Sequence, residues 1–232
     1  MIHVFEDAEA LAQAALEALT QGLTLGVAAR GRFRLALSGG RTPQPLYRLL
    51  AARDRDALDW SRGEVLFADE RAVAPDHPES NYRMVRELLL DPLGVPAGNV
   101  HRMRGEALDL ERAALEYESL LAEPLDLLVL GVGEDGHVAS LFPGAAALAE
   151  LRRRVVVVTG PKPPPRRLTV TPRVLSEAHH VLVIGSGVGK AWAVAEALEG
   201  ERGSVPARLV REREWYLDRS AARALGGAGR RG

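Results

Sequence analysis

The chain has 232 residues, 47% of them hydrophobic, which is enough for one domain with a sizeable core. Its net charge of −1 gives no general attraction to nucleic acid or to an anionic membrane. The absence of cysteine excludes disulfides, thiolate zinc sites and cysteine nucleophiles. Acidic residues interrupt the first apolar positions and no basic stretch precedes them, so we expect a cytoplasmic protein without a signal peptide or membrane span.

The first half of the chain alternates between helical and extended patterns. Apolar residues recur at helical spacing over 7–21, and a short strand at 32–40 ends in Ser38-Gly39-Gly40. Thr42 is expected to cap the next helix, with Pro43 at its first position. The elements predicted after the first strand are a helix at 42–53, a strand at 64–71, and helices at 79–90 and 108–123.

The second half repeats this alternation around more continuous apolar strands, of which "LDLLVLGVG" is the most apolar. A single α/β catalytic domain is therefore expected at 1–225, followed by a disordered tail at 226–232. The predicted elements are strands at 125–133 and 154–160, a proline-rich loop at 161–165, a strand, glycine turn and helix at 179–200, and a last strand and helix at 214–225.

Continuous apolar strands that alternate with helices are typical of a parallel sheet covered on both faces. We therefore expect an α/β fold of three layers, in which a mostly parallel, Rossmann-like sheet lies between helices. In such sheets, ligands bind at the carboxyl ends of the strands. Four segments lie at such ends and are the candidate sites: Ser38-Gly39-Gly40, Asp69-Glu70-Arg71, Gly133 to His137, and Gly185 to Lys190.

Glycines at 131, 133 and 136 spell the G-x-G-x-x-G of a dinucleotide-binding loop. That interpretation also needs an acidic residue at the end of the next strand to hold the ribose, and "VVVVTGPK" supplies none. Glu134 and Asp135 would also repel a pyrophosphate. The favoured interpretation is a catalytic loop, because His137 follows Asp135 by two residues at the end of a strand.

Two glycine turns at predicted helix starts are suited to bind a simple phosphate. "SGGRTP" at 38–43 lets the backbone approach an anion closely, and "GSGVGKA" at 185–191 adds Lys190, one of only two lysines in the chain. The second turn is not an ATPase loop, because Ile184 and Ala191 stand where that motif requires glycine and a hydroxyl residue. The alternative for 38–43 is a tight turn that binds nothing.

Other hydrolytic sites are not indicated. No G-x-S-x-G elbow surrounds Ser38, Ser140 or Ser186, which argues against a serine hydrolase. No histidine spacing typical of metal sites occurs, so we expect no metal. A lone histidine is usually structural, but the place of His137 in a glycine loop beside Asp135 favours catalysis.

Taken together, the motifs resemble those of a known family. "LSGGRTP", "FADER", "ESNY", "LLVLGVGEDGHVASLFPG", "RLTVTPRVL" and "LVIGSGVGKA" occur in this order along residues 35–191. The chain resembles the 6-phosphogluconolactonases over nearly its whole length and, more distantly, the glucosamine-6-phosphate deaminases, which share that fold. The G-x-G-x-D-G-H-x-A-S-L-F-P segment is the most specific part of the resemblance.

The resemblance implies a cofactor-free cytosolic enzyme of the pentose phosphate pathway that hydrolyses 6-phosphogluconolactone to 6-phosphogluconate. By position, His137 is implied to be the general base, Asp135 to orient or tune it, and Arg71 to lie near the lactone carbonyl or the sugar hydroxyls. The implied phosphate ligands are Ser38, Gly39, Gly40, Thr42, Lys190 and Arg167, with Arg166 as an alternative to Arg167. The other implied residues of the substrate site are Asp69, Glu70, Asn81 and Gly133.

The expected partner is a small sugar phosphate, with no nucleic acid and no membrane, and the chain is expected to be a monomer or a small homo-oligomer. Two other functions stay open. The deaminases carry G-H-I-A-F-N-E-P where this chain has "GHVASLFP", and their glutamate has no counterpart in Leu141-Phe142-Pro143. A non-catalytic sugar-phosphate sensor would keep the phosphate loops and lose the base, so His137 argues against it.

Overall fold

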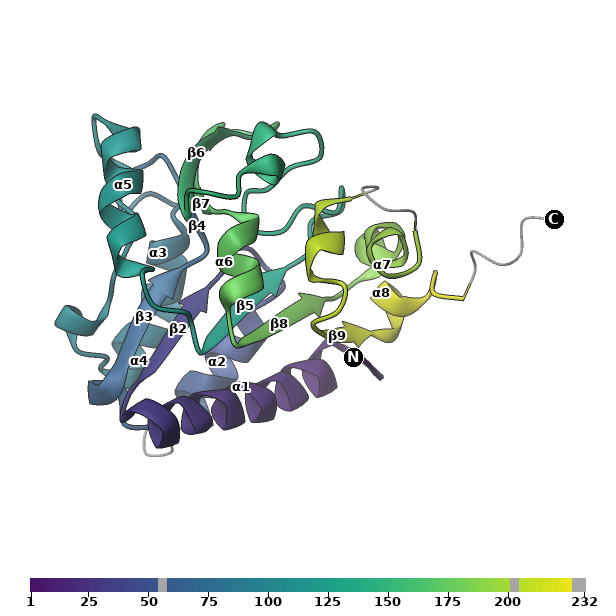
Figure 1. Cartoon of the computed structure of the whole chain (residues 1–232). Helices are drawn as coiled ribbons and strands as arrows, with labels where there is room; N and C mark the ends of the chain where they lie inside the picture. The colour runs from purple at the N-terminus through teal and green to yellow at the C-terminus, as the bar shows by residue number, and fades with distance from the viewer. Residues whose placement is uncertain (54–57, 201–204, 227–232) are drawn as a thin grey trace.

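The computed structural model describes residues 1–53, 58–200 and 205–226 and has the predicted α/β architecture (Figure 1). Six strands form one sheet in the order β1-β9-β8-β5-β2-β3, and every neighbouring pair in it is parallel. These strands are β1 (Ile2–Phe5), β2 (Phe33–Leu37), β3 (Gly63–Phe67), β5 (Leu127–Gly131), β8 (His180–Gly185) and β9 (Glu214–Asp218).

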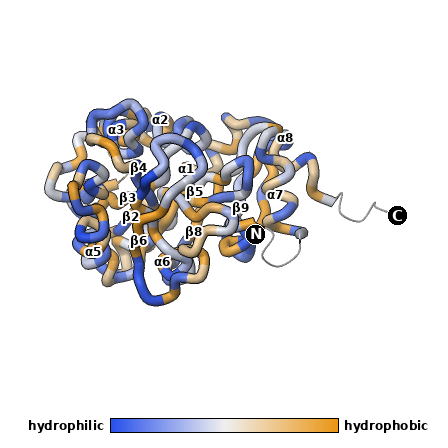
Figure 2. Tube along the Cα trace, turned by 90° about the horizontal axis from the view of Figure 1, so that it is seen from above, coloured by the Kyte–Doolittle hydropathy of each residue, from blue (hydrophilic) through white to orange (hydrophobic). Residues whose placement is uncertain are grey.

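Helices cover both faces of this sheet, which confirms the three predicted layers. In β5, Leu127 and Val129 pack in one hydrophobic core, whereas Leu128 and Leu130 pack in the other, because alternate residues of a strand face opposite sides. Figure 2 shows the hydrophobic central strands surrounded by more hydrophilic segments. The first core contains residues of α1 (Ala8–Arg30), α2 (Gln44–Arg53) and α3 (Asn81–Val85), and the second contains residues of α5 (Leu110–Leu120), α6 (Pro172–Glu177), α7 (Ala191–Leu198) and α8 (Arg219–Ala222).

A second sheet of three antiparallel strands is not predicted by the sequence pattern. The strand predicted at 64–71 is in fact two strands, because the chain changes sheets at Ala68. The Ala68 N–H donates to the carbonyl of Leu37 (2.9 Å) in the first sheet, and the Ala68 carbonyl accepts from Val170 (2.8 Å) in the second. The strands of the second sheet, in spatial order, are β4 (Asp69–Arg71), β7 (Arg166–Val170) and β6 (Val155–Thr159), the last being the strand predicted at 154–160.

Helix α1 continues past the predicted end at position 21 to Arg30. Glycine disfavours the interior of a helix, which is why the prediction ends near Gly22. In the structure, Gly22 faces Leu127 of β5, and Gly26 faces Asp126, the residue before that strand. A Cβ on Gly22 would lie 2.9 Å from Leu127 Cδ1, so the missing side chain lets α1 pack closely on β5. This tertiary contact outweighs the cost of glycine inside a helix, which is about 1 kcal/mol relative to alanine.

Two further helices differ in extent from the prediction, and one strand is not predicted. Helix α2 begins at Gln44, and no side-chain capping bond from Thr42 is present among the described residues. The helix predicted at 79–90 begins as α3 and passes into a π-helical turn and the short α4 (Asp91–Leu93). The sequence does not predict β1, a short edge strand. Positions 227–232 of the predicted tail lie outside the described residues.

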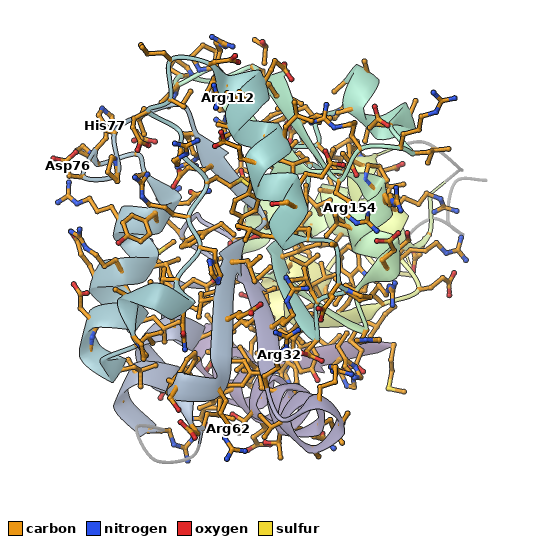
Figure 3. The ribbon with its side chains drawn as sticks, turned by 60° about the vertical axis from the view of Figure 1, so that its left-hand side comes forward. Arg32, Arg62, Asp76, His77, Arg112 and Arg154 are labelled. Carbon is orange, nitrogen blue, oxygen red and sulfur yellow. The ribbon has the colours of Figure 1, made fainter. Side chains whose placement is uncertain are left out.

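Several arginines outside the strand ends are paired with acids at the surface. Arg32 and Arg112, both labelled in Figure 3, lie 2.6 Å from Glu123 and 3.0 Å from Glu116. Exposed pairs of this kind contribute little to stability. By contrast, several cations at the carboxyl edge of the sheet form no salt bridge with the described residues, as shown below.

Candidate active site

The four candidate segments come together because the strands that precede them are neighbours. β8, β5, β2 and β3 lie side by side, so their carboxyl ends share one edge. The direction in which strands are added reverses between β2 and β5, which is where open α/β sheets bind ligands. A cleft of about 330 Å³ opens there. The predicted site residues that line it are Ser38, Gly39, Gly40, Thr42, Asp69, Arg71, Asn81, Gly133, Asp135, His137, Arg167 and Lys190.

The loop after β5 is a tight turn that presents His137 beside Asp135. The Gly133 N–H donates to the carbonyl of His137 (2.8 Å), and Gly136 has a φ of 78°, a conformation that favours glycine. A Cβ on Gly133 would overlap His137 Nδ1, so only glycine leaves room for the imidazole. His137 Nδ1 lies 2.5 Å from Asp135 Oδ1, and the described residues offer no hydrogen bond to Nε2.

The charges around this pair decide which ring nitrogen is free. The hydrogen bond with His137 lowers the pKa of Asp135 to about 2, so its carboxylate is ionised near neutral pH. An ionised carboxylate accepts from a protonated Nδ1, which leaves the lone pair of the neutral imidazole on Nε2. The arrangement can therefore accept a proton from a molecule bound in the cleft.

The turn after β2 is shaped to meet an anion. The Tyr47 O–H donates to the carbonyl of Ser38 (2.8 Å), and Gly40 has a φ of 89°. A Cβ on Gly39 would overlap Asn81 Oδ1, so glycine is required where this turn meets α3. Ser38 Oγ and Asn81 Oδ1 are buried without a hydrogen-bond partner among the described residues. Buried polar atoms in native structures are nearly always satisfied, so a ligand is the expected partner.

The turn after β8 is fixed by a buried acid beneath it. The Asp218 carboxylate accepts from Ser186 Oγ (2.6 Å) and from the Gly187 N–H (2.9 Å). This brings Lys190 to the cleft, where burial lowers its pKa. Glu134 and Asp135 oppose that shift, whereas Lys162 and Arg41 add to it.

The cations of the cleft are poorly neutralised. Unlike the surface arginines, Arg41, Lys162 and Lys190 take part in no salt bridge with the residues that the structure describes. Arg167 likewise has none, and burial lowers its pKa, with the charge of Arg71 adding to the effect. Close, unneutralised cations beside backbone N–H groups are suited to bind a phosphate dianion.

Asp69 lines the cleft, but its carboxylate is already occupied. It accepts from Ser140 Oγ (2.6 Å) and from Asn81 Nδ2 (3.0 Å). Asp69 is therefore placed to orient Asn81 and is less suited to act as a free base. Arg71 donates through Nη1 to the carbonyl of Glu79 (2.6 Å), while its Nε is buried without a partner among the described residues.

Glu70 is the one predicted site residue that does not line the cleft. Its buried carboxylate accepts from the backbone N–H groups of Arg71, Asn81 and Tyr82, each at 2.8 Å, and from Ser80 Oγ at 3.1 Å. Burial raises the pKa of Glu70, and these backbone bonds oppose the shift. Glu70 therefore acts on the site through the residues it holds.

The structure separates the two candidate arginines of β7. Arg167 is only 7% exposed and lines the cleft, whereas Arg166 is exposed and lines a different hollow, beside Gly105 and Pro165. Neighbouring residues of a strand point to opposite sides, which accounts for the difference.

Residues 1–53, 58–200 and 205–226 contain neither a cluster of metal ligands nor a membrane-spanning helix. No three His, Asp or Glu side chains are grouped as a metal site requires. No helix there is long and apolar enough to cross a membrane.

Comparison with known proteins places the chain in a family. The sequence model of the family described as "Glucosamine-6-phosphate isomerases/6-phosphogluconolactonase" matches residues 6–217. The chain belongs to this family. Among curated relatives, the 6-phosphogluconolactonase of Synechocystis sp. is 38% identical over 239 residues, covering 97% of this chain and 98% of the relative. The 6-phosphogluconolactonase of Mycobacterium tuberculosis is 38% identical over 242 residues, with the same coverage of both chains.

Solved structures of the family show the same fold. The 6-phosphogluconolactonase of Trypanosoma brucei superposes with a TM-score of 0.86 at 28% identity, covering 97% of this chain and 98% of that one. A monomeric glucosamine-6-phosphate deaminase superposes with a TM-score of 0.83 at 25% identity, covering 96% and 98%. The fold is thus shared by two activities, and residues of the cleft must distinguish them.

Three charged residues that line the cleft of this family member, Arg41, Glu134 and Lys162, were assigned no role of their own in the sequence analysis. Arg41 and Glu134 lie within the predicted segments 38–43 and Gly133 to His137, whereas Lys162 lies outside all of them. A usable signal existed for Lys162, because the rarity of lysine that drew attention to Lys190 applies equally to it. The cleft also contains Ala139, a non-glycine residue with a φ of 50°. No local pattern of the sequence predicts that conformation.

Proposed function

We propose that the chain is a 6-phosphogluconolactonase, which hydrolyses 6-phosphogluconolactone to 6-phosphogluconate with His137 as general base. The names of relatives that match nearly the whole chain at 38% identity support the reaction. The observation that carries the mechanism is that the Asp135–His137 pair shares one cleft with Arg41, Lys162 and Lys190, cations that form no salt bridge with the described residues. Such a cleft suits a substrate with a hydrolysable carbonyl near one end and a phosphate at the other.

In the proposed reaction, a water molecule attacks the lactone carbonyl carbon while His137 Nε2 takes its proton. Asp135 stays ionised and stabilises the imidazolium that forms. The carbonyl oxygen gains the negative charge, and the free Nε of Arg71 is our candidate donor to it. When the intermediate collapses, the bond to the ring oxygen breaks and that oxygen takes the proton from the imidazolium. General-base assistance of this kind is worth about 10²–10⁴-fold in rate.

The phosphate would hold the lactone in place for this attack. Its ligands in this proposal are the backbone and hydroxyls of Ser38 to Thr42, with Lys190 and Arg167, and now also Lys162 and Arg41. Binding energy from a remote group that does not react can be used to align the carbonyl with the water. The proposal therefore predicts that phosphate contacts and the base can be altered separately.

The deaminase is the second candidate, because the monomeric deaminase shares the fold with a TM-score of 0.83. The deaminase motif G-H-I-A-F-N-E-P has a carboxylate where this chain has Leu141-Phe142-Pro143. Leu141 and Phe142 are buried and apolar, so this segment offers no acid for ring opening. The sensor hypothesis is weaker, because it gives no role in proton transfer to the aligned Asp135–His137 pair.

The test is acid release from freshly prepared 6-phosphogluconolactone, with ammonia release from glucosamine 6-phosphate measured beside it. We expect acid release above the uncatalysed rate and no ammonia. His137→Asn should lower kcat by about 10²-fold or more while affinity for 6-phosphogluconate changes little. Ammonia release at a matching rate would place the chain with the deaminases. Near-full kcat in His137→Asn would mean that another group is the base.

A cytoplasmic location and a monomeric or small homo-oligomeric state stay predictions within this proposal. A sedimentation measurement on the purified chain tests the second.

A further inference from the structure

One aromatic ring contacts both the proposed base and a proposed phosphate ligand. The ring centroid of Phe142 lies 4.8 Å from that of His137, with 47° between the ring planes. The guanidinium carbon of Arg167 lies 5.3 Å from the centroid of the same ring. Phe142 is only 6% exposed, so the ring is enclosed by the groups it touches.

Gly160 allows this close packing. A Cβ on Gly160 would lie 2.7 Å from Phe142 Cε2 and 3.2 Å from Arg167 Nε. Gly160 has no need of a positive φ, so close approach is the reason that this position lacks a side chain. The phenyl ring of Phe142 and the guanidinium of Arg167 therefore both pack against the backbone of Gly160.

Arg167 extends the same packing to the loop after β6. Its Nε donates to the carbonyl of Pro164 (3.2 Å) and its Nη2 to that of Lys162 (3.4 Å). The Gly160 N–H closes the loop by donating to the carbonyl of Pro165 (2.7 Å). A displacement of the Phe142 ring would therefore shift the Arg167 guanidinium and the loop that carries Lys162.

We propose that Phe142 is a positioning residue that fixes the imidazole of His137 and the guanidinium of Arg167 relative to each other. Asp135 holds His137 through one ring nitrogen only, which leaves the tilt of the imidazole to be set by what packs against it. Phe142 supplies that surface and the flat face on which Arg167 rests. The inference rests on the proposed function, because it assigns the base to His137 and phosphate binding to Arg167.

The test compares Phe142→Leu with the same substitution at Phe5, which stacks on Tyr216 at the edge strand β1. Phe142→Leu should lower kcat about 10-fold, since small misplacements of a base cost that much or more. It should also weaken 6-phosphogluconate binding about 3–10-fold, because Arg167 loses its cation–π surface. Phe5→Leu should change neither. Loss of thermal stability in Phe142→Leu with unchanged kcat and affinity would reduce Phe142 to a structural residue and overturn the proposal.

Gly160→Ala provides a second route, because it displaces the ring without removing it. It should lower kcat and 6-phosphogluconate affinity, and adding Phe142→Leu, which makes room for the new methyl group, should cost less than the sum of the two changes. Additive losses would mean that the two residues act separately, which contradicts the proposal.

A readout that does not depend on turnover separates this inference from the proposed function. The imidazole NMR signal of His137, identified by its absence in His137→Asn, should broaden in Phe142→Leu, because an imidazole without a fixed tilt samples several orientations, and it should stay sharp in Phe5→Leu. If the unaltered enzyme fails to hydrolyse the lactone, the proposed function is wrong, and the NMR comparison still decides whether Phe142 sets the imidazole. A His137 signal that shifts without broadening, as the loss of a neighbouring aromatic ring alone would cause, would overturn the inference whatever the activity.

Discussion

The Asp135–His137 pair makes a pH-dependent prediction at the scale of single residues. The depressed pKa of Asp135, about 2, means that its carboxylate stays charged through the whole range in which the enzyme can be assayed. Its stabilising contribution is present above the ordinary pKa of 3.8 and is lost only as the pH falls through about 2. We therefore expect any fall of kcat/KM on the acid side that occurs well above pH 2 to come from a group other than Asp135.

Asp135→Asn is the variant that checks this assignment. Removing a carboxylate that favours the imidazolium should move the acid limb to lower pH, and loss of the fixed tautomer should lower kcat about 10-fold or more. The uncatalysed hydrolysis must be subtracted at each pH. If the acid limb keeps its position in Asp135→Asn, a group remote from Asp135 controls it, and the base is not His137.

The two lysines give a second prediction, on phosphate recognition. Lys190→Ala removes a half-buried charge and should raise KM about 10–150-fold, the value of one charge-assisted hydrogen bond. Lys162→Ala should cost less, because its side chain is exposed. Neither change should affect hydrolysis of unphosphorylated gluconolactone, which lacks the group they bind. Equal damage on both lactones would mean that the lysines hold the fold of the cleft and do not bind phosphate.

At the scale of residues, local sequence patterns predict the site residues that follow parallel strands, whereas Asn81 and Arg167 are indicated only by the family resemblance. Ser38, Asp135 and Lys190 could be foreseen because a glycine turn at the end of an apolar strand has a known position in an α/β sheet. Lys162 could not be placed in that way, since it lies in the turn between the antiparallel strands β6 and β7. Only the pairing of β7 with β4, a contact distant in sequence, brings that turn to the cleft.

At the scale of elements, Glu70 joins strand β4 to the start of α3. Glu70→Gln leaves one acceptor oxygen for four donors and turns an amide N–H₂ toward N–H groups. We expect a loss of about 1–3 kcal/mol in unfolding free energy, the cost of unsatisfied buried groups. The raised pKa of Glu70 means that this carboxylate favours folding less as the pH rises above its ordinary value of 4.5. The loss should therefore be measured at a fixed pH.

Urea unfolding of Glu70→Gln measures this loss, and Glu87→Gln, an exposed residue paired with Arg83, is its matched control. The control should stay within about 0.5 kcal/mol of the unaltered chain. KM should rise in Glu70→Gln alone, because Glu70 holds the backbone of Arg71 and Asn81. A stable Glu70→Gln variant with normal KM would show that neither residue depends on it.

The sequence predicts the elements whose burial leaves a local pattern and misses those set by contacts distant in the chain. Periodicity places the main helices and apolar strands, because burial on one or both faces leaves a pattern in the chain. It does not place the change of sheet at Ala68, where nothing local distinguishes a continuous strand from two strands. The deciding hydrogen bonds join Ala68 to Leu37 and Val170, the second of them about one hundred positions away.

At the scale of the whole molecule, the sheet separates two hydrophobic cores that share its strands. Trp60 lies in the core beneath α1 and α2, and Trp215 lies in the other, beneath α7 and α8. The second sheet belongs to the core of Trp215, since Leu168 and Val170 pack there. A strand such as β5 cannot leave one core without leaving the other, so we expect the described parts of the chain to unfold as one unit.

Single-tryptophan variants test this expectation. Trp192→Phe/Trp215→Phe leaves Trp60 as reporter, and Trp60→Phe/Trp192→Phe leaves Trp215, while Trp192 itself is 57% exposed and dispensable. In each variant, the urea transition followed by fluorescence should coincide with that followed by circular dichroism, as two-state unfolding requires. 6-Phosphogluconate at about 100 times its Kd should stabilise both variants by about 2.7 kcal/mol, because a ligand of one cooperative unit stabilises all of it. A ligand effect confined to one reporter, or transitions that separate, would divide the predicted single domain into two.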